Sequence, residues 1–326
     1  MRSKVTSTKQ EDDLLSLVIP IYRNEGSLPE LLQAVSGLNA GLQGNFEAVF
    51  VVDGSPDRCY ELLRDRLPAC EFRAKLALLS RNFGSFAAIR AGLELGEGEQ
   101  FAVMAADLQE PPELILQMAK VLRQEEIDVV VAAREGRQDP LLTRLPSEIF
   151  WGLYRRFVVP EIPPGGVDIF ACNRAFRDQL LQLEERHSSL IAQIFWLGYR
   201  RKFISYTRQE RKHGKSAWTL QKKVNYLMDS VFSFTDLPIR LLIRTGGGAA
   251  ILSGLFGILV AVCRLAGLIE VTGYAPTILI IIFFGSLNLF GLGIIGSYAW
   301  RTYENTKARP HRVVLHCHAF PSQEAG

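Results

Sequence analysis

The sequence predicts an α/β protein with a mostly parallel, twisted sheet, followed by amphipathic juxtamembrane helices and a hairpin of two transmembrane helices. Two observations predict this fold. Short apolar runs alternate with helical periodicity over residues 15–133, which is typical of a sheet covered by helices on both faces. Residues 246–263 and 271–300 then carry no charge, and the second run exceeds the roughly 20 residues that span a bilayer.

Five apolar runs have the length of buried strands, and between them apolar residues recur at helical spacing. The strands are predicted over residues 15–20, 46–52, 74–79, from residue 101, and over 128–133. Ser27, with Glu30 three residues later, is typical of a capping box that starts the first helix. Pro111 and Pro112 are predicted to start the helix after the fourth strand.

Polar side chains follow the strands where each strand ends. Asp53 follows the second strand, and Asp107 and Gln109 follow the fourth. Open α/β sheets bind ligands beyond the carboxyl ends of their strands, so these residues are predicted to share one edge. In an extended segment Asp107 and Gln109 would point the same way, and their oxygens would suit Mg²⁺ or Mn²⁺. The alternative is a helix-capping acid at Asp107 and a turn acid at Asp53.

The two uncharged runs are predicted to be transmembrane helices at about 245–267 and 275–300. Basic residues flank both ends of this pair: Arg240, Arg244, Arg301, Lys307, Arg309 and Arg312. The positive-inside rule therefore predicts that the preceding domain and the C-terminus are cytoplasmic. Glycines in the first run suit close helix packing and self-association. Two core helices of a soluble protein are the alternative.

Before the first span, apolar residues recur at helical spacing over 220–232. They predict an amphipathic helix, either on the membrane surface or in the core of the soluble domain. Pro238 is predicted to start a second juxtamembrane helix that ends at Arg244. The predicted domains are a disordered tail (1–14), a cytoplasmic α/β domain (15–218), juxtamembrane helices (219–244), two transmembrane helices (245–300) and a cytoplasmic C-terminal tail (301–326).

Composition excludes several classes of protein. A net charge of +3 gives no strong field for nucleic acid. Five cysteines without a C-x-x-C pair are typical of reduced thiols in the cytosol. The polar N-terminus lacks the apolar core of a signal peptide, and the absence of G-x-G-x-x-G disfavours a Rossmann dinucleotide site.

Several motifs resemble one family. The run D-L-Q-E-P-P at 107–112, V-I-P-I-Y-R-N-E at 18–25, D-G-S at 53–55 and R-K-H-G-K-S-A-W at 211–218 resemble the family-two glycosyltransferases that act on polyprenyl phosphates. That group includes dolichyl-phosphate mannosyltransferases, undecaprenyl-phosphate glucosyltransferases and aminoarabinose transferases. The resemblance covers about residues 15–312 and implies a glycosyltransferase-A-type fold.

The resemblance implies an inverting hexosyltransferase in the cytoplasmic membrane. It would transfer a hexose from a nucleotide-sugar to polyprenyl phosphate, for cell envelope glycosylation, with a Mg²⁺ or Mn²⁺ cofactor. UDP-glucose is the favoured donor, and GDP-mannose or a UDP-aminoarabinose-type donor are alternatives. The partners would be the donor, the lipid phosphate and the bilayer, with a homo-oligomer compatible with the small-residue spans.

The resemblance also assigns roles to residues. Donor binding falls to Pro20, Tyr22, Glu25, Asp53, Asp107 and Asp168. Acceptor phosphate binding falls to Arg134, Arg144, Ser147, Arg211 and Ser216. Catalysis falls to Asp107, Arg134, Arg211 and Lys215, and metal binding to Asp107 and Gln109.

One position departs from the family pattern Asp-x-Asp-Leu-Gln. Ala105 stands where the first Asp is expected, which removes one carboxylate from the predicted metal site. Val52 likewise replaces the first acid of the family's Asp-Asp-Gly-Ser turn. A membrane-anchored protein that binds a nucleotide-sugar without turnover is therefore the alternative function, and a scaffold for a neighbouring flippase is a third.

Overall fold

The structure is a computed structural model that describes residues 14–134, 152, 154–156, 158–163, 166–185, 188–209, 220–268 and 274–322. The chain divides into two compact units. The α/β unit comprises Met1–Glu185, Ser189–Lys223 and Pro310–Gly326. The helical unit comprises Arg186–Ser188 and Val224–Arg309.

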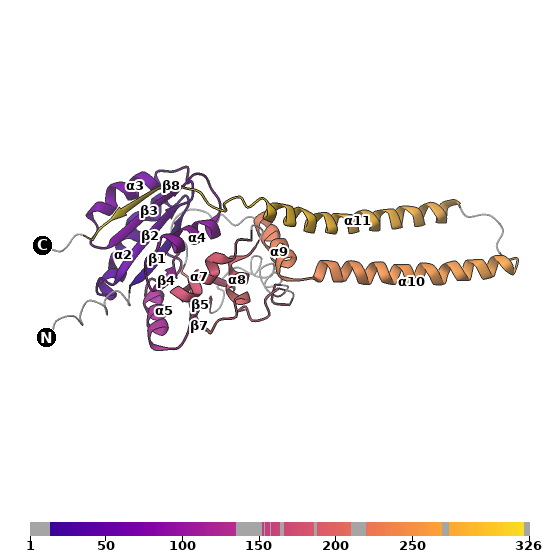
Figure 1. Cartoon of the computed structure of the whole chain (residues 1–326), viewed down its shortest axis with the longest axis horizontal. Coiled ribbons are helices and arrows are strands. Elements are labelled where there is room, and N and C mark those ends of the chain that lie inside the picture. The colour runs from indigo at the N-terminus through magenta and orange to yellow at the C-terminus, as the bar shows by residue number, and fades with distance from the viewer. Residues whose placement is uncertain are drawn as a thin grey trace. The chain divides into compact units, whose positions relative to one another are not determined.

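The α/β unit is built on an eight-stranded sheet in the order β7-β5-β6-β4-β1-β2-β3-β8 (Figure 1). The strands are β1 (Leu15–Ile21), β2 (Phe46–Val52), β3 (Arg73–Leu79), β4 (Gln100–Val103), β5 (Val129–Arg134), β6 (Val167–Asn173), β7 (Arg201–Tyr206) and β8 (Val314–Phe320). The five strands that the sequence predicts, β1 to β5, all run in one direction, whereas β6 and β8 are antiparallel to their neighbours. The predicted α/β class is confirmed, and the sheet is mixed.

Helices cover both faces of this sheet (Figure 1). The helices of the unit are η1 (Glu25–Ser27), α2 (Leu28–Gly41), α3 (Cys59–Arg66), η2 (Leu67–Ala69), α4 (Ser85–Leu95), α5 (Glu113–Gln124), α7 (Arg174–Gln182) and α8 (Leu190–Trp196). Leu17 and Ile19 of β1 belong to the core cluster that includes residues of α2, α3 and α5. Their neighbour Val18 points to the opposite face, as strand alternation requires, and meets α4 at Gly92. A Cβ at Gly92 would lie 2.2 Å from Val18 Cγ1, so glycine allows this close approach.

Strand β8 was not predicted, and it comes from the segment that the sequence analysis describes as a C-terminal tail. It pairs antiparallel with β3, where His318 is the partner of Leu76. The rings of His318 and Tyr60 of α3 lie 6.4 Å apart between centroids. Most β8 side chains are exposed because the strand lies at the sheet edge, and this exposure hides the apolar alternation by which buried strands are predicted.

Asp128 joins three strands at the amino end of β5. Its carboxylate accepts hydrogen bonds from Arg200 N (3.2 Å) and Nε (3.1 Å), next to β7, and from Asn173 Nδ2 (3.0 Å) of β6. Burial alone raises the pKa of Asp128, but the hydrogen bonds from Arg200 and Asn173 outweigh it and hold the pKa below the ordinary value of 3.8.

Asp128→Ala is therefore expected to lower the free energy of unfolding by about 2 kcal/mol at neutral pH, since hydrogen bonds to a charged group are lost. A lowered pKa contributes stability that is present above 3.8 and is lost as the pH falls through the folded-state pKa. Thermal unfolding in detergent should show the variant and the wild type converging below pH 4 or so. An equal difference at pH 7 and at pH 3 or so would contradict this account.

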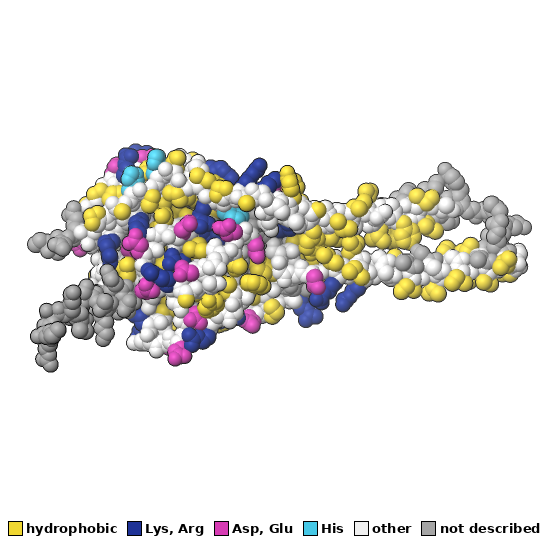
Figure 2. Space-filling model, viewed as in Figure 1, with side chains coloured by type: hydrophobic (Ala, Val, Ile, Leu, Met, Phe, Trp, Pro, Cys, Tyr) yellow, Lys and Arg dark blue, Asp and Glu magenta, His cyan; other side chains and the backbone are white. Residues whose placement is uncertain are grey.

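The helical unit comprises most of α9 (Leu220–Phe234), with α10 (Leu237–Leu265) and α11 (Tyr274–Thr306). Two of its helices are long and apolar enough to cross a membrane, within Leu237–Val260 and Phe283–Thr306. Hydrophobic side chains cover both (Figure 2). The predicted pair of candidate membrane helices is thus present in the fold.

Helix α9 packs on α11 through one face. Arg301 Nη2 donates to Asp229 Oδ1 at 2.7 Å, and the rings of Phe232 and Tyr298 lie 5.1 Å apart. On another part of α9, Val224 and Met228 remain 50% and 44% exposed. This residue pattern agrees with the predicted amphipathic helix and places it outside the core of the α/β unit.

The predicted helix end at Arg244 is wrong. Helix α10 begins at Leu237 and runs unbroken to Leu265. Pro238 lies in its first turn, where a missing N–H costs no helical hydrogen bond. Gly246, Gly247 and Gly248 follow, and each weakens a helix by only about 1 kcal/mol, which does not end it.

Candidate active site

Three loops meet at the carboxyl edge of the parallel strands. They follow β1, β2 and β4, which are neighbours in the order β4-β1-β2. Val52 is the register partner of Ile21, and Asp53 N donates to Ile21 O at 2.9 Å directly beyond the strands. This edge is where the sequence predicts the donor site.

Asp53 holds a fourth loop at this edge. Its side chain is 2% exposed, and its two carboxylate oxygens accept from Phe83 N (2.7 Å) and Gly84 N (2.8 Å) in the loop that starts α4. Burial raises the pKa of Asp53, and the two backbone donors and the Arg81 charge oppose that rise. A carboxylate has about four acceptor positions, so Asp53 retains capacity for a further donor.

Gly54, the next residue, makes this arrangement sterically feasible. Its φ is 54°, in the left-handed region that glycine tolerates. A Cβ there would lie 2.3 Å from the carbonyl carbon of Arg81. The β2 and β3 loops can therefore touch only because residue 54 has no side chain.

Hydrogen bonds join the β1 and β2 loops. Arg23 N donates to Ser55 Oγ at 2.8 Å, and Glu25 N donates to Asp57 Oδ2 at 3.2 Å. In return, Arg58 N donates to Glu25 Oε2 at 3.1 Å. Although burial raises the pKa of Asp57, its hydrogen bonds, first that from Ser55, outweigh this and lower the pKa. Glu25, which is predicted to bind the nucleotide-sugar, is thus held by Arg58 where the two loops meet.

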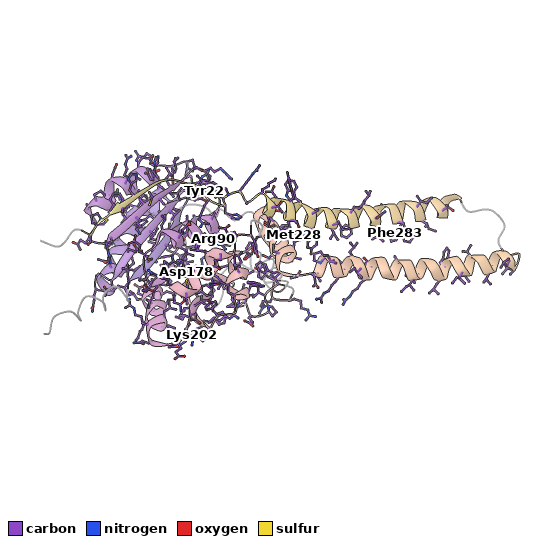
Figure 3. The ribbon with its side chains drawn as sticks, viewed as in Figure 1. Tyr22, Arg90, Asp178, Lys202, Met228 and Phe283 are labelled. Carbon is purple, nitrogen blue, oxygen red and sulfur yellow. The ribbon has the colours of Figure 1, made fainter. Side chains whose placement is uncertain are left out.

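Tyr22 lies immediately beyond β1 at the same edge (Figure 3). It is half-buried, as is Pro20 at the penultimate position of the strand. The Arg23 guanidinium carbon lies 5.4 Å from the centroid of the Tyr22 ring. An aromatic ring in this position offers a surface on which a nucleobase can stack.

The β4 loop turns sharply after the strand. β4 ends at Val103, and Leu108 has a φ of 53°. Ser27 Oγ lies 2.9 Å from Ala106 O and donates to it, which ties this loop to the β1 loop. The prediction that Asp107 and Gln109 share a side by strand alternation is wrong, because the segment is a turn. The predicted capping box is also wrong, because the Ser27 side chain makes no cap hydrogen bond.

Gln109 is engaged with the segment that follows β7. Its carbonyl oxygen accepts from Gln209 N at 2.8 Å, and its side-chain Nε2 donates to Gln209 O at 3.3 Å. Its Oε1 accepts from Arg208 Nη2. The same oxygen therefore pairs with a guanidinium in this arrangement, and the metal-binding role of Gln109 stays a prediction.

The remaining predicted residues divide into three groups. Arg134 ends β5 at the same edge and is the register partner of Tyr206. Asp168 lies in β6, but its side chain is outside the described part. Arg144, Ser147, Arg211, Lys215 and Ser216 lie outside the described residues.

Sequence reasoning missed Asp57 and Arg208. Asp57 belongs to the run D-G-S-P-D, where the second acid had no assigned role. Arg208 lies two residues beyond the end of β7, a strand that the sequence analysis did not predict. A cation just past a strand end is a usable signal only once that strand is known.

The oxygen ligands that the protein offers at this edge suit a hard cation that takes its remaining ligands from the substrate. Within the described residues no group of three His, Cys, Asp or Glu side chains could hold a metal. Mg²⁺ commonly takes one or two protein carboxylates and completes its shell with phosphate oxygens and water. A single carboxylate such as that of Asp107 therefore fits a metal that binds together with a diphosphate.

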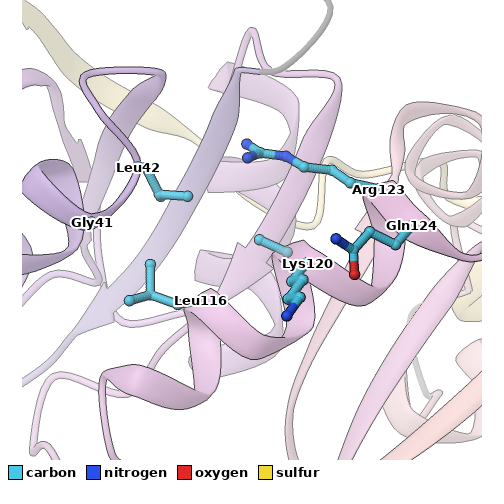
Figure 4. Close-up of a pocket in the computed structure, with 7 residues that line it drawn as sticks. Gly41, Leu42, Leu116, Lys120, Arg123 and Gln124 are labelled. Carbon is cyan, nitrogen blue, oxygen red and sulfur yellow. The ribbon is translucent and has the colours of Figure 1, made fainter.

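A surface hollow of about 250 Å³ lies elsewhere (Figure 4). It is lined by Gly41, Leu42, Leu116, Ala119, Lys120, Arg123 and Gln124. Asp107 precedes the first turn of α5, whereas Arg123 and Gln124 end that helix and Gly41 ends α2, so the hollow centres on the opposite ends of these helices. The hollow is therefore remote from the candidate site.

Residues 16–183 match the family described as glycosyl transferase family 2. The putative glycosyltransferase CsbB of Bacillus subtilis is 35% identical over 92% of this chain and 91% of its own. The undecaprenyl-phosphate 4-deoxy-4-formamido-L-arabinose transferase of Pseudomonas aeruginosa is 35% identical over 91% of this chain and 88% of its own. Among solved structures, glucosyl-3-phosphoglycerate synthase of Mycobacterium tuberculosis has a TM-score of 0.45, with 16% identity, over 71% of this chain and 86% of that one.

Proposed function

Because the chain belongs to glycosyltransferase family 2, we propose that it transfers a sugar from a nucleotide-sugar to undecaprenyl phosphate at a membrane surface, with inversion at the anomeric carbon. The observation that carries the proposal is the convergence of Tyr22, Asp53 and Asp107 at one sheet edge in a chain that also has two candidate membrane helices. Relatives named as undecaprenyl-phosphate transferases match along nearly the whole length of the chain.

The attacking group in this reaction is a phosphate oxygen of the lipid. The second pKa of a phosphate monoester is about 6, so the oxygen is largely anionic at neutral pH and needs no general base. The protein must hold that oxygen in line with the anomeric carbon and stabilise the nucleotide diphosphate as it leaves. Asp107 would hold a divalent cation, which supplies Lewis-acid stabilisation of the leaving diphosphate when bound. Arg134, at the same edge, would bind phosphate.

The other predicted residues keep their roles as proposals. Tyr22 and Asp53 would contact the nucleoside, with Pro20 and Glu25 shaping the loops around it. Asp168 would face the sugar. Arg144, Ser147, Arg211, Lys215 and Ser216 would complete the phosphate sites.

The sugar is the least constrained part of the proposal. The names of the relatives favour a 4-deoxy-4-formamido-L-arabinose-type donor over the UDP-glucose that the sequence analysis favours. GDP-mannose is the third candidate.

A transfer assay separates these donors. Membranes carrying the chain would receive undecaprenyl phosphate, Mg²⁺ or Mn²⁺, and each labelled donor in parallel. Label extracted into organic solvent with one donor, and lost with EDTA, is the expected result. Nucleotide binding without label in lipid from any donor would instead favour a binding protein without turnover, and Ala105→Asp would then be tested for restored transfer.

We also propose that the α/β unit and the C-terminus are cytoplasmic. Aromatic and basic residues at the end of α11 support this orientation: Lys307 Nζ lies 4.2 Å from the ring centroid of Tyr303 and 5.1 Å from that of Trp300. Aromatic side chains favour the membrane interface, and basic residues favour its cytoplasmic side. Cys317 is exposed in β8, so in a Cys263→Ser background a membrane-impermeant maleimide should label the chain in inverted vesicles but not in intact cells. Labelling in intact cells would reverse the orientation.

A further inference from the structure

Arg208 lies at the same sheet edge as the residues assigned to substrate binding. It is two residues beyond Tyr206, the last residue of β7 and the register partner of Arg134. Strands β5 and β7 are parallel, so their carboxyl ends lie side by side. Arg208 and Arg134 therefore extend from neighbouring strand ends on the edge that also carries Asp107.

Gln109 fixes the orientation of Arg208. Gln109 is 9% exposed as a residue, and its side-chain Oε1 accepts from Arg208 Nη2. Two further hydrogen bonds between Gln109 and Gln209, at 2.8 and 3.3 Å, hold the backbone next to Arg208. On its other side, Gln109 N donates to Asp107 Oδ1 at 3.4 Å. One residue thus links the carboxylate of Asp107 to the guanidinium of Arg208.

Arg208 keeps one buried donor without an acceptor. Its Nε is inaccessible to solvent and has no hydrogen-bond partner among the residues that the structure describes. A buried guanidinium N–H without an acceptor is unfavourable and uncommon, since such groups are normally paired. A phosphate oxygen that binds at this edge would supply an acceptor for this N–H once the atoms around Nε move to admit it.

We propose that Arg208 is a phosphate-binding residue that Gln109 positions beside Asp107. A guanidinium pairs well with phosphate because its planar N–H fork matches two phosphate oxygens. Ala105 stands at this edge where the resembled family has an acid. With one carboxylate fewer beside it, the Arg208 guanidinium can offset more of the negative charge of a bound phosphate. This inference rests on the proposed function, because that function supplies the two phosphates that Arg208 could bind. They are the diphosphate of the nucleotide-sugar and the phosphate of the lipid.

Binding measurements on the full-length protein in detergent test this role without requiring turnover. Inorganic pyrophosphate stands for the donor diphosphate, and farnesyl phosphate stands for the lipid phosphate. Isothermal titration would compare the wild type with Arg208→Ala, Arg208→Lys and Gln109→Ala. Arg64→Ala is the matched control, because it removes one positive charge from an exposed position on α3.

Arg208→Ala is expected to weaken the binding of one of the two probes by about 10- to 100-fold, the usual worth of a charge-assisted hydrogen bond. The probe that weakens identifies the source of the phosphate. Arg208→Lys should recover part of the loss, because it keeps the charge but lacks the planar fork. Gln109→Ala should weaken the same probe less, and adding it to Arg208→Ala should cause no further loss.

A purely structural Arg208 would behave differently. Arg208→Ala would then lower the thermal unfolding temperature and leave the affinities for both probes equal to those of Arg64→Ala, and that result would overturn the proposal. Because neither probe contains a sugar or a nucleoside, this outcome is distinct from a failure of the transfer assay, which tests the proposed function.

Discussion

Asp107→Asn is expected to lower the rate of sugar transfer by about 100- to 1,000-fold, the range seen when one group that stabilises transition-state charge is removed. The substitution keeps an oxygen that can accept from Gln109 N, which lies 3.4 Å from Oδ1, so the turn itself should persist. It removes the negative charge that would hold a divalent cation next to the donor diphosphate. The measurement is the initial rate of label transfer to undecaprenyl phosphate at saturating donor, over a series of Mn²⁺ concentrations.

Asp65→Asn is the control for this variant, because Asp65 is a 69% exposed acid on α3. It should transfer sugar at the wild-type rate, and both variants should unfold at the wild-type temperature. A transfer rate for Asp107→Asn within a factor of about three of the control would mean that Asp107 does not stabilise charge in the reaction, since that factor is worth less than 1 kcal/mol.

Gly54→Ala should destabilise the α/β unit by about 2 to 5 kcal/mol. A left-handed non-glycine residue costs about 1–2 kcal/mol, and forcing a clash costs about 1–3 kcal/mol more. The new Cβ would lie 2.3 Å from the backbone of Arg81, and backbone atoms cannot move aside as a flexible side chain can. The loop that would shift contains Phe83 and Gly84, whose N–H groups donate to the Asp53 carboxylate. Because Asp53 is proposed to contact the nucleoside, nucleotide binding should weaken as well.

Thermal unfolding in detergent is the measurement, with Gly37→Ala as a matched glycine control. Gly37 lies inside α2, and nothing is within 4 Å of the position that its Cβ would take. Alanine there should stabilise the helix by about 0.5–1 kcal/mol, because it is the better helix former. If both variants unfolded at the same temperature, the contact between the β2 and β3 loops would not depend on residue 54.

The parts of the fold that were predictable from the sequence are those whose signal is local. Strands β1 to β5 are short buried runs, and Asp53 and Asp107 follow strand ends, so their common edge could be inferred before the sheet order was known. The two candidate membrane helices were also evident, because a long uncharged segment is unusual in a soluble chain.

The parts that could not be predicted depend on contacts between distant segments. The Ser27 hydroxyl reaches Ala106 O, so its tertiary partner replaces the helix cap that the local pattern indicates. Gln109 engages Arg208 and Gln209, which lie about a hundred positions later in the chain. No spacing rule connects such pairs, because their proximity follows from the order of strands in the sheet.

Strand β8 has a consequence for the biogenesis of the protein. The strand that covers the β3 edge follows both candidate membrane helices in the chain, so it is synthesised after them. Until then β3 has unpaired backbone groups along one side, which is the kind of edge on which other chains can assemble. The α/β unit can therefore complete its sheet only after the ribosome has made the helical unit.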